Sequence, residues 1–537
     1  MTKALDLTDI QGNIIKGYGR YGFPVARYTF FRIEDSQKGR DFVNGVLQKV
    51  TSAVTWASDK NPSGIPKPPA TTNIAFTYNG LVALGLPLRS LKGFPPEFVT
   101  GMKVRKEILG DDGPSAPEHW DKIWQDEPVH VWVSINGRNK DAIEERYQWL
   151  RAILAKSAGG VVQLTGHRGE AGDDLPYQEA AALLDANGYP TPKEHFGYTD
   201  GIGNPVFEGQ FPEDEYYRVI GQGKPTRNKD VLKAWQPLAT GEFILGHPDE
   251  AEEYPAAPAP KLLSRNGTYM VYRKLHENVG AFNNFLKNLA KDFPGGEELL
   301  AAKFSGRWRD NGAPLDFAPD VESKNMLDKK IKAIDLRIAN PVSPEDKKSA
   351  EEEKLALRIR WVNFNYSDDP SGAKCPLSAH IRRINPRGSL EHNTESFNTP
   401  GALVNRRRLL RRGLPYGKVV NPSADNGDHG IIFMALNASI ERQFEFVQQQ
   451  WVNFGNDFSQ GNVKEVLLGN HCPASPSSVL LQTNPDAPDA PDAPDAGGRP
   501  FFVSNIPRMV ETRGGDFFFI PSLTALRMIA EGTIDPT

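Results

Sequence analysis

The sequence predicts an α+β fold, because strand-like and helix-like segments are mixed without the strict alternation of a doubly wound sheet. Over residues 129–135, apolar side chains occupy every second position, which is the period of a half-buried strand. Over residues 440–451, apolar side chains recur at steps of three and four, which is the period of an amphipathic helix. The chain therefore combines both kinds of element in an irregular order.

Further segments rich in β-branched and aromatic residues extend this prediction along the chain. A second helix is predicted over residues 143–156. Additional strands are predicted over residues 26–33, 73–78, 267–274, 430–436 and 516–522.

Four irregular segments separate these elements. Residues 209–240 are polar and poor in strand pattern, so we expect the main domain break between about 206 and 240. Residues 253–261 predict an exposed Pro/Ala connection, and the charged run 343–354 predicts a solvated helix face or a surface insertion. Residues 485–498 repeat Pro-Asp-Ala and end in two glycines, which predicts a surface loop that adds nothing to a core.

Composition excludes several classes of protein. A length of 537 residues allows about two to four structural units. The net charge of −4 gives no support for a nucleic-acid or membrane partner. The N-terminus lacks the pattern of a signal peptide, and no apolar run is long enough to span a bilayer. Two cysteines, Cys375 and Cys472, exclude a disulfide framework and a thiolate zinc site, so we expect a cytoplasmic protein.

Two motifs attract attention and are rejected. Residues 17–22 match GxGxxG, but Pro24 and a strand-like segment follow where a dinucleotide site needs a helix. The basic cluster 405–412 could bind phosphate, but solvated or carboxylate-paired side chains are the simpler interpretation for most of its arginines.

Two segments resist a purely structural interpretation. Residues 194–205 surround Asp200 with three glycines and a proline, which describes a tight loop that can approach another group closely. The residues alone also fit a plain turn in which Asp200 caps a helix or an Asx-turn. Residues 375–387 place His380 before an arginine-rich stretch, and arginines near a histidine suit a cofactor with carboxylate groups.

These two segments resemble the dye-decolourising peroxidase family. GYTDG at 197–201 is similar to the family's GxxDG signature, and CPLSAHIRRINPR at 375–387 is similar to its proximal-histidine segment. The resemblance covers most of the chain and is to the longer members of the family in particular. It includes residues 5–14, 73–87, 241–250, 266–275, 411–417 and 444–453.

The resemblance implies a haem b group, one per chain, bound through His380 as the axial iron ligand. It implies that Asp200 and Arg411 act on the opposite, distal face of the haem, and that Arg387 contacts a haem propionate. Glu465 matches the position of an acid hydrogen-bonded to the proximal histidine, with Glu445 as the alternative.

The remaining implied contacts to the cofactor are apolar or small. Ile202 and Gly203 follow Asp200 in its loop, and Ile431 and Phe433 alternate along a predicted strand so that both face the distal side.

The family fold implies two ferredoxin-like halves with antiparallel sheets and haem held mainly in the C-terminal half. We therefore expect an N-terminal domain over 1–206, which carries the GxxDG loop, a connection over 207–240, and a haem-binding domain over 241–537. The implied activity is reduction of hydrogen peroxide and one-electron oxidation of dyes, phenols and similar donors through a ferryl intermediate.

Two alternatives remain. A haem-binding or haem-handling protein would need His380 but not the pair Asp200 and Arg411, and a binding protein without haem would need none of them. No nucleic-acid or membrane partner is expected, and an oligomer is possible.

Overall fold

A computed structural model describes residues 5–19, 22–57, 64–126, 128–169, 171–211, 213–228, 230, 233–391, 400–474, 476–481 and 500–535. Within these ranges, none of the helices combines the length and the apolar character needed to cross a membrane.

The N-terminal half has a ferredoxin-like βαββαβ order. It consists of β1 (Val25–Ile33), α2 (Ser36–Leu47), β2 (Ala70–Phe76), β3 (Val131–Gly137), α8 (Lys140–Lys156) and β4 (Val161–Gln163). All strand pairs are antiparallel, in the order β2-β3-β1-β4, and β7 (Gln178–Ala181) also pairs with β1. Side-chain caps start both helices, because Asp35 accepts from the Lys38 amide and Asn139 accepts from the Ala142 amide.

The C-terminal half repeats this order with longer insertions. Its strands are β10 (Thr268–Glu277), β11 (Leu410–Tyr416), β12 (Gly430–Asn437) and β15 (Val510–Ile520), arranged antiparallel as β11-β12-β10-β15. Its helices are α10 (Val279–Leu289) and a helix over Glu441–Glu445 and Val447–Val452 that is wound more widely than an α-helix. The α+β prediction with two ferredoxin-like halves is therefore confirmed.

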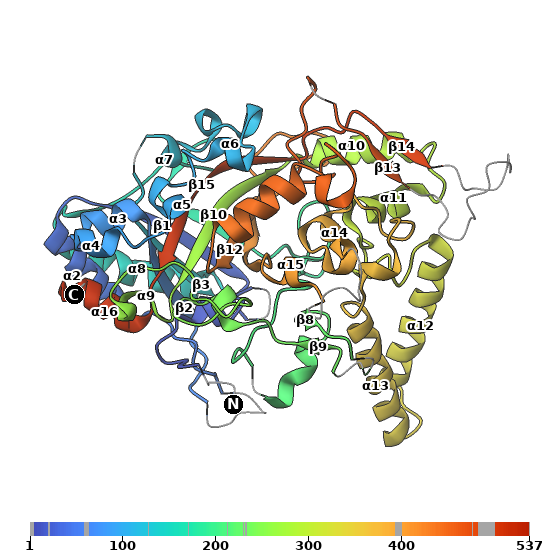
Figure 1. The fold of residues 1–537 in the computed structure, drawn as a ribbon, viewed down its shortest axis with the longest axis horizontal. Coiled ribbons are helices and arrows are strands. Elements are labelled where there is room, and N and C mark those ends of the chain that lie inside the picture. Colours follow the sequence, from blue (N-terminus) through green and yellow to red (C-terminus); the bar gives the residue numbers. More distant parts are fainter. Residues whose placement is uncertain are drawn as a thin grey trace.

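The two halves share one sheet and one core. Strand β15 pairs with β2 through Phe519 and Phe76, which joins the halves edge to edge (Figure 1). Aromatic side chains from both halves then meet inside the curved sheet. Tyr272 of β10 lies with its ring centroid 5.9 Å from that of Tyr28 and 5.3 Å from that of Phe30, both on β1. This shared core holds the loop after β7 against the C-terminal strands.

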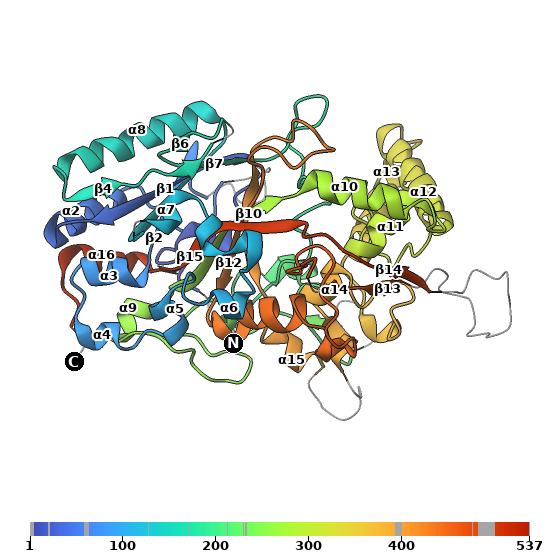
Figure 2. The same ribbon diagram turned by 90° about the horizontal axis from the view of Figure 1, so that it is seen from above.

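Several elements lie outside the two repeats. The C-terminal helix α16 (Leu523–Glu531) returns to the N-terminal half and packs beside α2 (Figure 2). Helices α12 (Val321–Ala339) and α13 (Pro344–Arg360) form a hairpin that projects from the body (Figure 1). Caps begin both helices of this hairpin, at Asp320 and at Ser343.

The remaining α-helices and β-strands of the described chain are short. The helices are α1 (Gly12–Ile15), α3 (Tyr78–Ala83), α4 (Leu88–Leu91), α5 (Pro96–Thr100), α6 (Lys106–Leu109), α7 (Lys122–Gln125), α9 (Lys261–Ser264), α11 (Gly296–Ser305), α14 (His380–Ile384) and α15 (Ala402–Asn405). The strands are β5 (His167–Arg168), β6 (Asp174–Leu175), β8 (Lys224–Pro225), β9 (Trp235–Gln236), β13 (Val479–Leu481) and β14 (Phe501–Val503).

The predicted strands and helices are all present, with ends that shift by a few residues. The charged run 343–354 is the outward part of α13, as expected of a solvated helix face. Strand β1 begins at Val25, so no helix follows the GxGxxG match. The repeat at 485–498 lies outside the described residues, and the domain limits at 206 and 240 remain predictions.

Candidate active site

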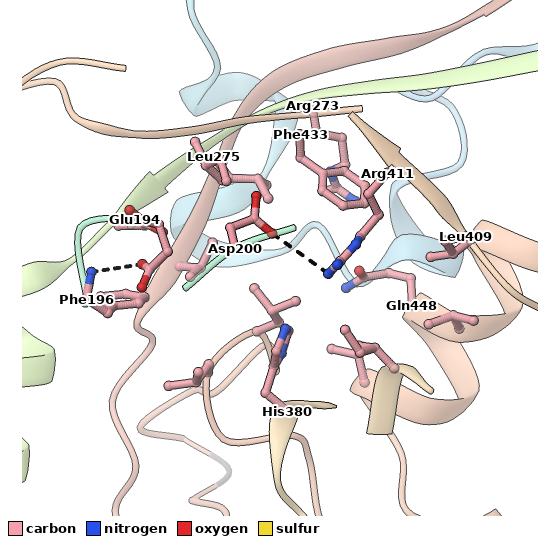
Figure 3. Close-up of a pocket in the computed structure, with 18 of the residues that line it drawn as sticks. Glu194, Phe196, Asp200, Arg273, Leu275, His380, Leu409, Arg411, Phe433 and Gln448 are labelled. Carbon is pink, nitrogen blue, oxygen red and sulfur yellow. Dashed lines mark hydrogen bonds and ion pairs between the residues drawn. The ribbon is translucent and has the colours of Figure 1, made fainter. Parts of the chain in front are cut away.

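A cavity in the C-terminal half brings together the two segments singled out in the sequence. It is lined by the loop that carries Asp200, by strands β10, β11 and β12, and by helix α14, which begins at His380. Figure 3 shows His380 on one side of this cavity, with Asp200 and Arg411 facing it from the other side. Asp200 and His380, which are 180 positions apart in the chain, therefore face the same cavity.

Asp200 is held by a loop that only glycine-rich sequence can form. Gly197, Gly201 and Gly203 have φ values of 93°, 83° and 80°, in the left-handed region that favours glycine. The Asp200 amide donates to the Pro192 carbonyl at 2.8 Å, and the Gly201 amide donates to Asp200 Oδ1 at 2.6 Å. The Asp200 side chain remains 45% exposed, so its carboxylate is accessible to a small molecule in the cavity.

Arg411 faces the same space from strand β11. Its Nη1 lies 4.0 Å from Asp200 Oδ1, and its Nη2 donates to the Ile202 carbonyl at 3.0 Å. The Arg411 amide donates to Asn204 Oδ1 at 3.1 Å, which ties the Asp200 loop to the strand. This tie fixes a carboxylate and a guanidinium beside each other across two separate segments.

His380 presents one ring nitrogen to the cavity and turns the other toward a buried acid. Its Nδ1 lies 3.5 Å from Glu465 Oε1, and the Glu465 side chain is 0% exposed. Burial by itself would raise the pKa of Glu465, but the adjacent His380 and the amides of Leu467 and Leu468 outweigh it and lower that pKa. An ionised Glu465 beside Nδ1 leaves Nε2 as the nitrogen available to a metal centre.

Glu445, the alternative acid, lies elsewhere. Its carboxylate forms a two-pronged ion pair with Arg105, whose Nη2 donates to Glu445 Oε2 at 2.6 Å. The fold therefore brings Glu465, and not Glu445, to His380.

Apolar side chains line the rest of the distal wall. Ile431 and Phe433 of β12 both contact the cavity, as their alternation along the strand predicts, and Ile202 contacts it from the Asp200 loop. Gly203 and Arg387 line a smaller cavity that adjoins the first and shares Ile202 and Arg411 with it.

Four arginines converge on this smaller cavity, namely Arg307, Arg387, Arg408 and Arg411. Within the described chain, no carboxylate oxygen lies within 4.0 Å of the Arg307, Arg387 or Arg408 side-chain nitrogens. Arg387 donates instead to the carbonyls of Val362 and Phe364. Burial lowers the pKa of Arg307 and of Arg387 to about 10.

Among these buried arginines without a carboxylate partner in the described chain, Arg408 has the most strongly lowered pKa. Burial and the neighbouring Arg387 and Arg411 lower its pKa to about 9, and its guanidinium donates only to backbone carbonyls. Buried cations without anions are unfavourable. The two carboxylates of a porphyrin would neutralise this cluster, so the residues present fit haem: one imidazole for iron and an arginine-lined end for propionates.

Sequence reasoning missed part of this site. Arg307 comes from a segment with no distinguishing motif. The interpretation of most arginines in the run 405–412 as solvated or carboxylate-paired does not extend to Arg408, which is 5% exposed and donates to backbone carbonyls. Glu194 and Glu277 also line the cavity, and Glu194 is part of the quoted loop segment. In the described chain, no group of three or more His, Cys, Asp or Glu side chains is arranged around a bare metal ion.

Known proteins are similar in sequence to this chain over nearly its whole length. A family model described as "DyP dimeric alpha+beta barrel domain" matches residues 9–168. The multifunctional dye peroxidase DyP2 of Amycolatopsis sp. is 28% identical over 549 residues, which cover 97% of this chain and 96% of that protein. The dye-decolorizing peroxidase msp1 of Mycetinis scorodonius is 26% identical over 543 residues, which cover 98% of this chain and 88% of that protein.

Solved structures share the fold. A variant of the dye-decolorizing peroxidase from Pleurotus ostreatus superposes with a TM-score of 0.71 at 21% identity, over 98% of this chain and 99% of that chain. The Amycolatopsis DyP2 structure gives a TM-score of 0.64 at 24% identity, over 97% and 96%. The family model over residues 9–168, the relatives that align over nearly the whole chain and the common fold all identify the dye-decolourising peroxidase family.

Proposed function

We propose that this protein is a haem-dependent peroxidase that reduces hydrogen peroxide and oxidises phenols, dyes and similar one-electron donors. The observation that carries the proposal is the opposition of one imidazole, His380, to a carboxylate and a guanidinium, Asp200 and Arg411, across a single cavity. Haem b, one per chain, would bind there and supply the redox centre that accepts oxidising equivalents from peroxide.

The residues of the chain then have separate tasks. Nε2 of His380 would bind the iron, and Glu465 would strengthen that imidazole as a donor through Nδ1. Arg387, Arg307 and Arg408 would hold the haem carboxylates. Ile202, Gly203, Ile431 and Phe433 surround the distal space and limit the water that enters it.

Asp200 and Arg411 act on the peroxide itself. Heterolysis of its O–O bond requires a proton to leave one oxygen and reach the other. The Asp200 carboxylate accepts that proton and returns it to the departing oxygen, as a general base followed by a general acid. Arg411 stabilises the negative charge that develops on the peroxide oxygens, because a guanidinium keeps its charge at any working pH.

The relatives support this assignment of substrate class. Those named above are dye peroxidases, and a dye-decolorizing peroxidase of the same fold has been solved in complex with 2,6-dimethoxyphenol, at 22% identity and a TM-score of 0.68.

We also propose the domain limits 1–206, 207–240 and 241–537. The two free cysteines, Cys375 and Cys472, support a cytoplasmic location.

The absorbance spectrum of the purified protein tests the cofactor, and two variants test the reaction. We expect a Soret band in the wild type that is lost in His380→Ala. Asp200→Asn and Arg411→Leu should keep the band but oxidise 2,6-dimethoxyphenol with peroxide about 10²- to 10⁴-fold more slowly. Haem-loaded variants that turn over at the wild-type rate would favour a haem-handling protein instead.

A further inference from the structure

Two further acids, Glu194 and Glu277, border the cavity that holds Asp200, and no step of the proposed reaction uses them. Glu194 begins the Asp200 loop, and Glu277 ends strand β10. Figure 3 shows Glu194 next to Asp200, on the side of the cavity away from His380. Glu277 is only 4% exposed and Glu194 is half-buried. Within the described residues, neither carboxyl has a Lys, Arg or His nitrogen of a side chain within 4.0 Å.

Hydrogen bonds hold the two carboxyls against each other. Glu194 accepts from the Phe196 amide at 2.8 Å and from the Tyr198 amide at 2.6 Å. Glu277 accepts from the His195 amide at 3.3 Å, so one turn of backbone orients both side chains. These contacts at His195, Phe196 and Tyr198 place the two carboxyls at the same turn of backbone. Two carboxyl groups in contact can hydrogen-bond only when one of them carries a proton, because two carboxylates have no hydrogen to share.

Burial and the neighbouring carboxyl favour a proton on one member of the pair. Burial raises the pKa of Glu277 well above its ordinary value, and the neighbouring Glu194 raises it further. Burial also raises the pKa of Glu194, although the two amides that it accepts from oppose the effect. The two sites titrate as a pair, with Glu277 as the member that keeps the proton.

Nearby charges do not neutralise the pair. Cations in this region have other partners: Arg273 pairs with Asp111, Arg508 with Asp112 and Arg513 with Glu511. Lys193, the residue before Glu194, donates to the carbonyls of Arg309 and Asp310. The histidines around it are held neutral, since burial lowers the pKa of His195 to about 4 and of His276 to about 3. The other titratable groups that face it are His429, Tyr198, Tyr416 and Asp200.

We propose that Glu277 and Glu194 hold one shared proton and deliver it to Asp200, through water in the cavity, during each turnover. The inference rests on the proposed function. Reduction of peroxide follows H₂O₂ + 2 e⁻ + 2 H⁺ → 2 H₂O, with the electrons supplied by the phenol or dye. A phenol releases one proton with each electron, but it does so at the place where it is oxidised, and Asp200 only moves a proton between the two peroxide oxygens. The two protons that the equation consumes must therefore be delivered into the cavity.

The pair is placed to supply one of them. The O–H bond of Glu277 breaks, the proton passes through water to the Asp200 carboxylate, and Asp200 transfers it to the second peroxide oxygen, which becomes water once it has received two protons and two electrons. Two ionised acids remain side by side, which is unfavourable, so the pair takes a proton back from water that enters the cavity. Glu194 is a positioning residue in this sequence, because it orients Glu277 and disfavours its ionised form.

Two isosteric substitutions and a remote control test the proposal. In Glu277→Gln the amide still donates a hydrogen bond to Glu194 but cannot release a proton, so the fold and the Soret band should persist. Glu194→Gln removes the partner charge and should shift the infrared carbonyl band of protonated Glu277. Glu97→Gln is the control, because Glu97 is a buried acid whose pKa burial also raises but which lines neither cavity.

The first readout is independent of turnover. The infrared spectrum of wild type minus Glu277→Gln should contain one protonated-carboxyl band at pH 7, in protein with or without haem. The second readout is steady-state oxidation of 2,6-dimethoxyphenol, in which Glu277→Gln should lose about tenfold in kcat at pH 7 and much less in acid, where solvent protons are abundant. Glu97→Gln should follow the wild-type pH profile.

The failures of the two proposals are distinguishable. A wild type without a Soret band, or an unimpaired Asp200→Asn variant, overturns the peroxidase assignment. An active wild type and an impaired Asp200→Asn variant, with no Glu277 band in the infrared spectrum or with an unchanged pH profile in Glu277→Gln, overturns the shared proton alone.

Discussion

Replacement of Lys274 by methionine should destabilise the protein more than any surface substitution. Lys274 lies on β10 with its Nζ 2.9 Å from Asp121 Oδ2 and 2.8 Å from Asp428 Oδ2. Its side chain is 1% exposed, and those of Asp121 and Asp428 are 2% and 8% exposed. Asp121 belongs to the N-terminal half, so this triad joins the two halves behind the cavity wall that carries Glu277.

The expected magnitude follows from the burial of all three groups. Removal of one partner from a buried ion pair costs about 3–5 kcal/mol, because the opposite charge is left uncompensated. Here Lys274 is the cation with which both carboxylates pair, so its removal leaves two buried carboxylates uncompensated. With an unfolding entropy of about 2.1 cal/mol/K per residue, the 537-residue chain has a total of about 1.1 kcal/mol/K. The melting temperature should therefore fall by about 3–5 °C if the chain unfolds as one unit.

The pH dependence gives a second, independent signature. Burial already raises the pKa of Asp121, Lys274 opposes that rise and Asp428 adds to it. Without Lys274 the folded-state pKa rises further. An acid with a raised folded-state pKa contributes stability below its unfolded pKa of about 3.9, and this contribution is lost as the pH rises. The variant should approach the wild type near pH 4 and fall furthest behind it near neutrality.

Scanning calorimetry at several pH values measures both effects. The matched control is the triple variant Lys274→Met, Asp121→Asn, Asp428→Asn, which removes all three charges and should recover most of the lost stability. A triple variant no more stable than Lys274→Met, or a loss independent of pH, would refute the electrostatic explanation and leave lost packing as the cause.

Three further predictions concern the site and its surroundings. Arg408→Gln should lose about 1.5–3 kcal/mol of haem binding, the value of one charge-assisted hydrogen bond, measured as faster haem transfer to apomyoglobin; unchanged transfer would remove Arg408 from the propionate cluster. Asn204→Ala, which removes the side-chain tie between the Asp200 loop and the Arg411 amide, should lower kcat/KM for peroxide with the Soret band intact, and an unchanged value would mean that this tie does not position Asp200. Burial lowers the pKa of His471 to about 4, so its contribution to stability is present above about pH 6.5 and is lost as the pH falls through 4. Wild type should therefore lose about 3 kcal/mol more than His471→Gln between pH 6.5 and 4, and equal melting curves at both pH values would contradict this assignment.

Local patterns were sufficient for the helices and strands, and they drew attention to two residues of the site, Asp200 and His380. The alternation along residues 430–436 predicts both strand β12 and the common orientation of Ile431 and Phe433, because successive side chains of a strand point to opposite faces. Asp200 and His380 stand out because each lies in a short segment whose composition is unusual on its own, whereas Arg411 was identified only through the resemblance to the peroxidase family.

Tertiary structure alone decided which distant residues share a space. Arg307, Arg387 and Arg408 become one cation cluster, and Glu194 and Glu277 become one acid pair, only when separate strands and loops converge. The basic run 405–412 illustrates the limit, since its composition is that of a solvated surface while Arg408 is buried. The sequence determines the period of apolar side chains along each helix or strand and the local turns between them. Burial and charge partners depend on neighbours brought from far along the chain. These neighbours determine the chemistry of an ionisable group.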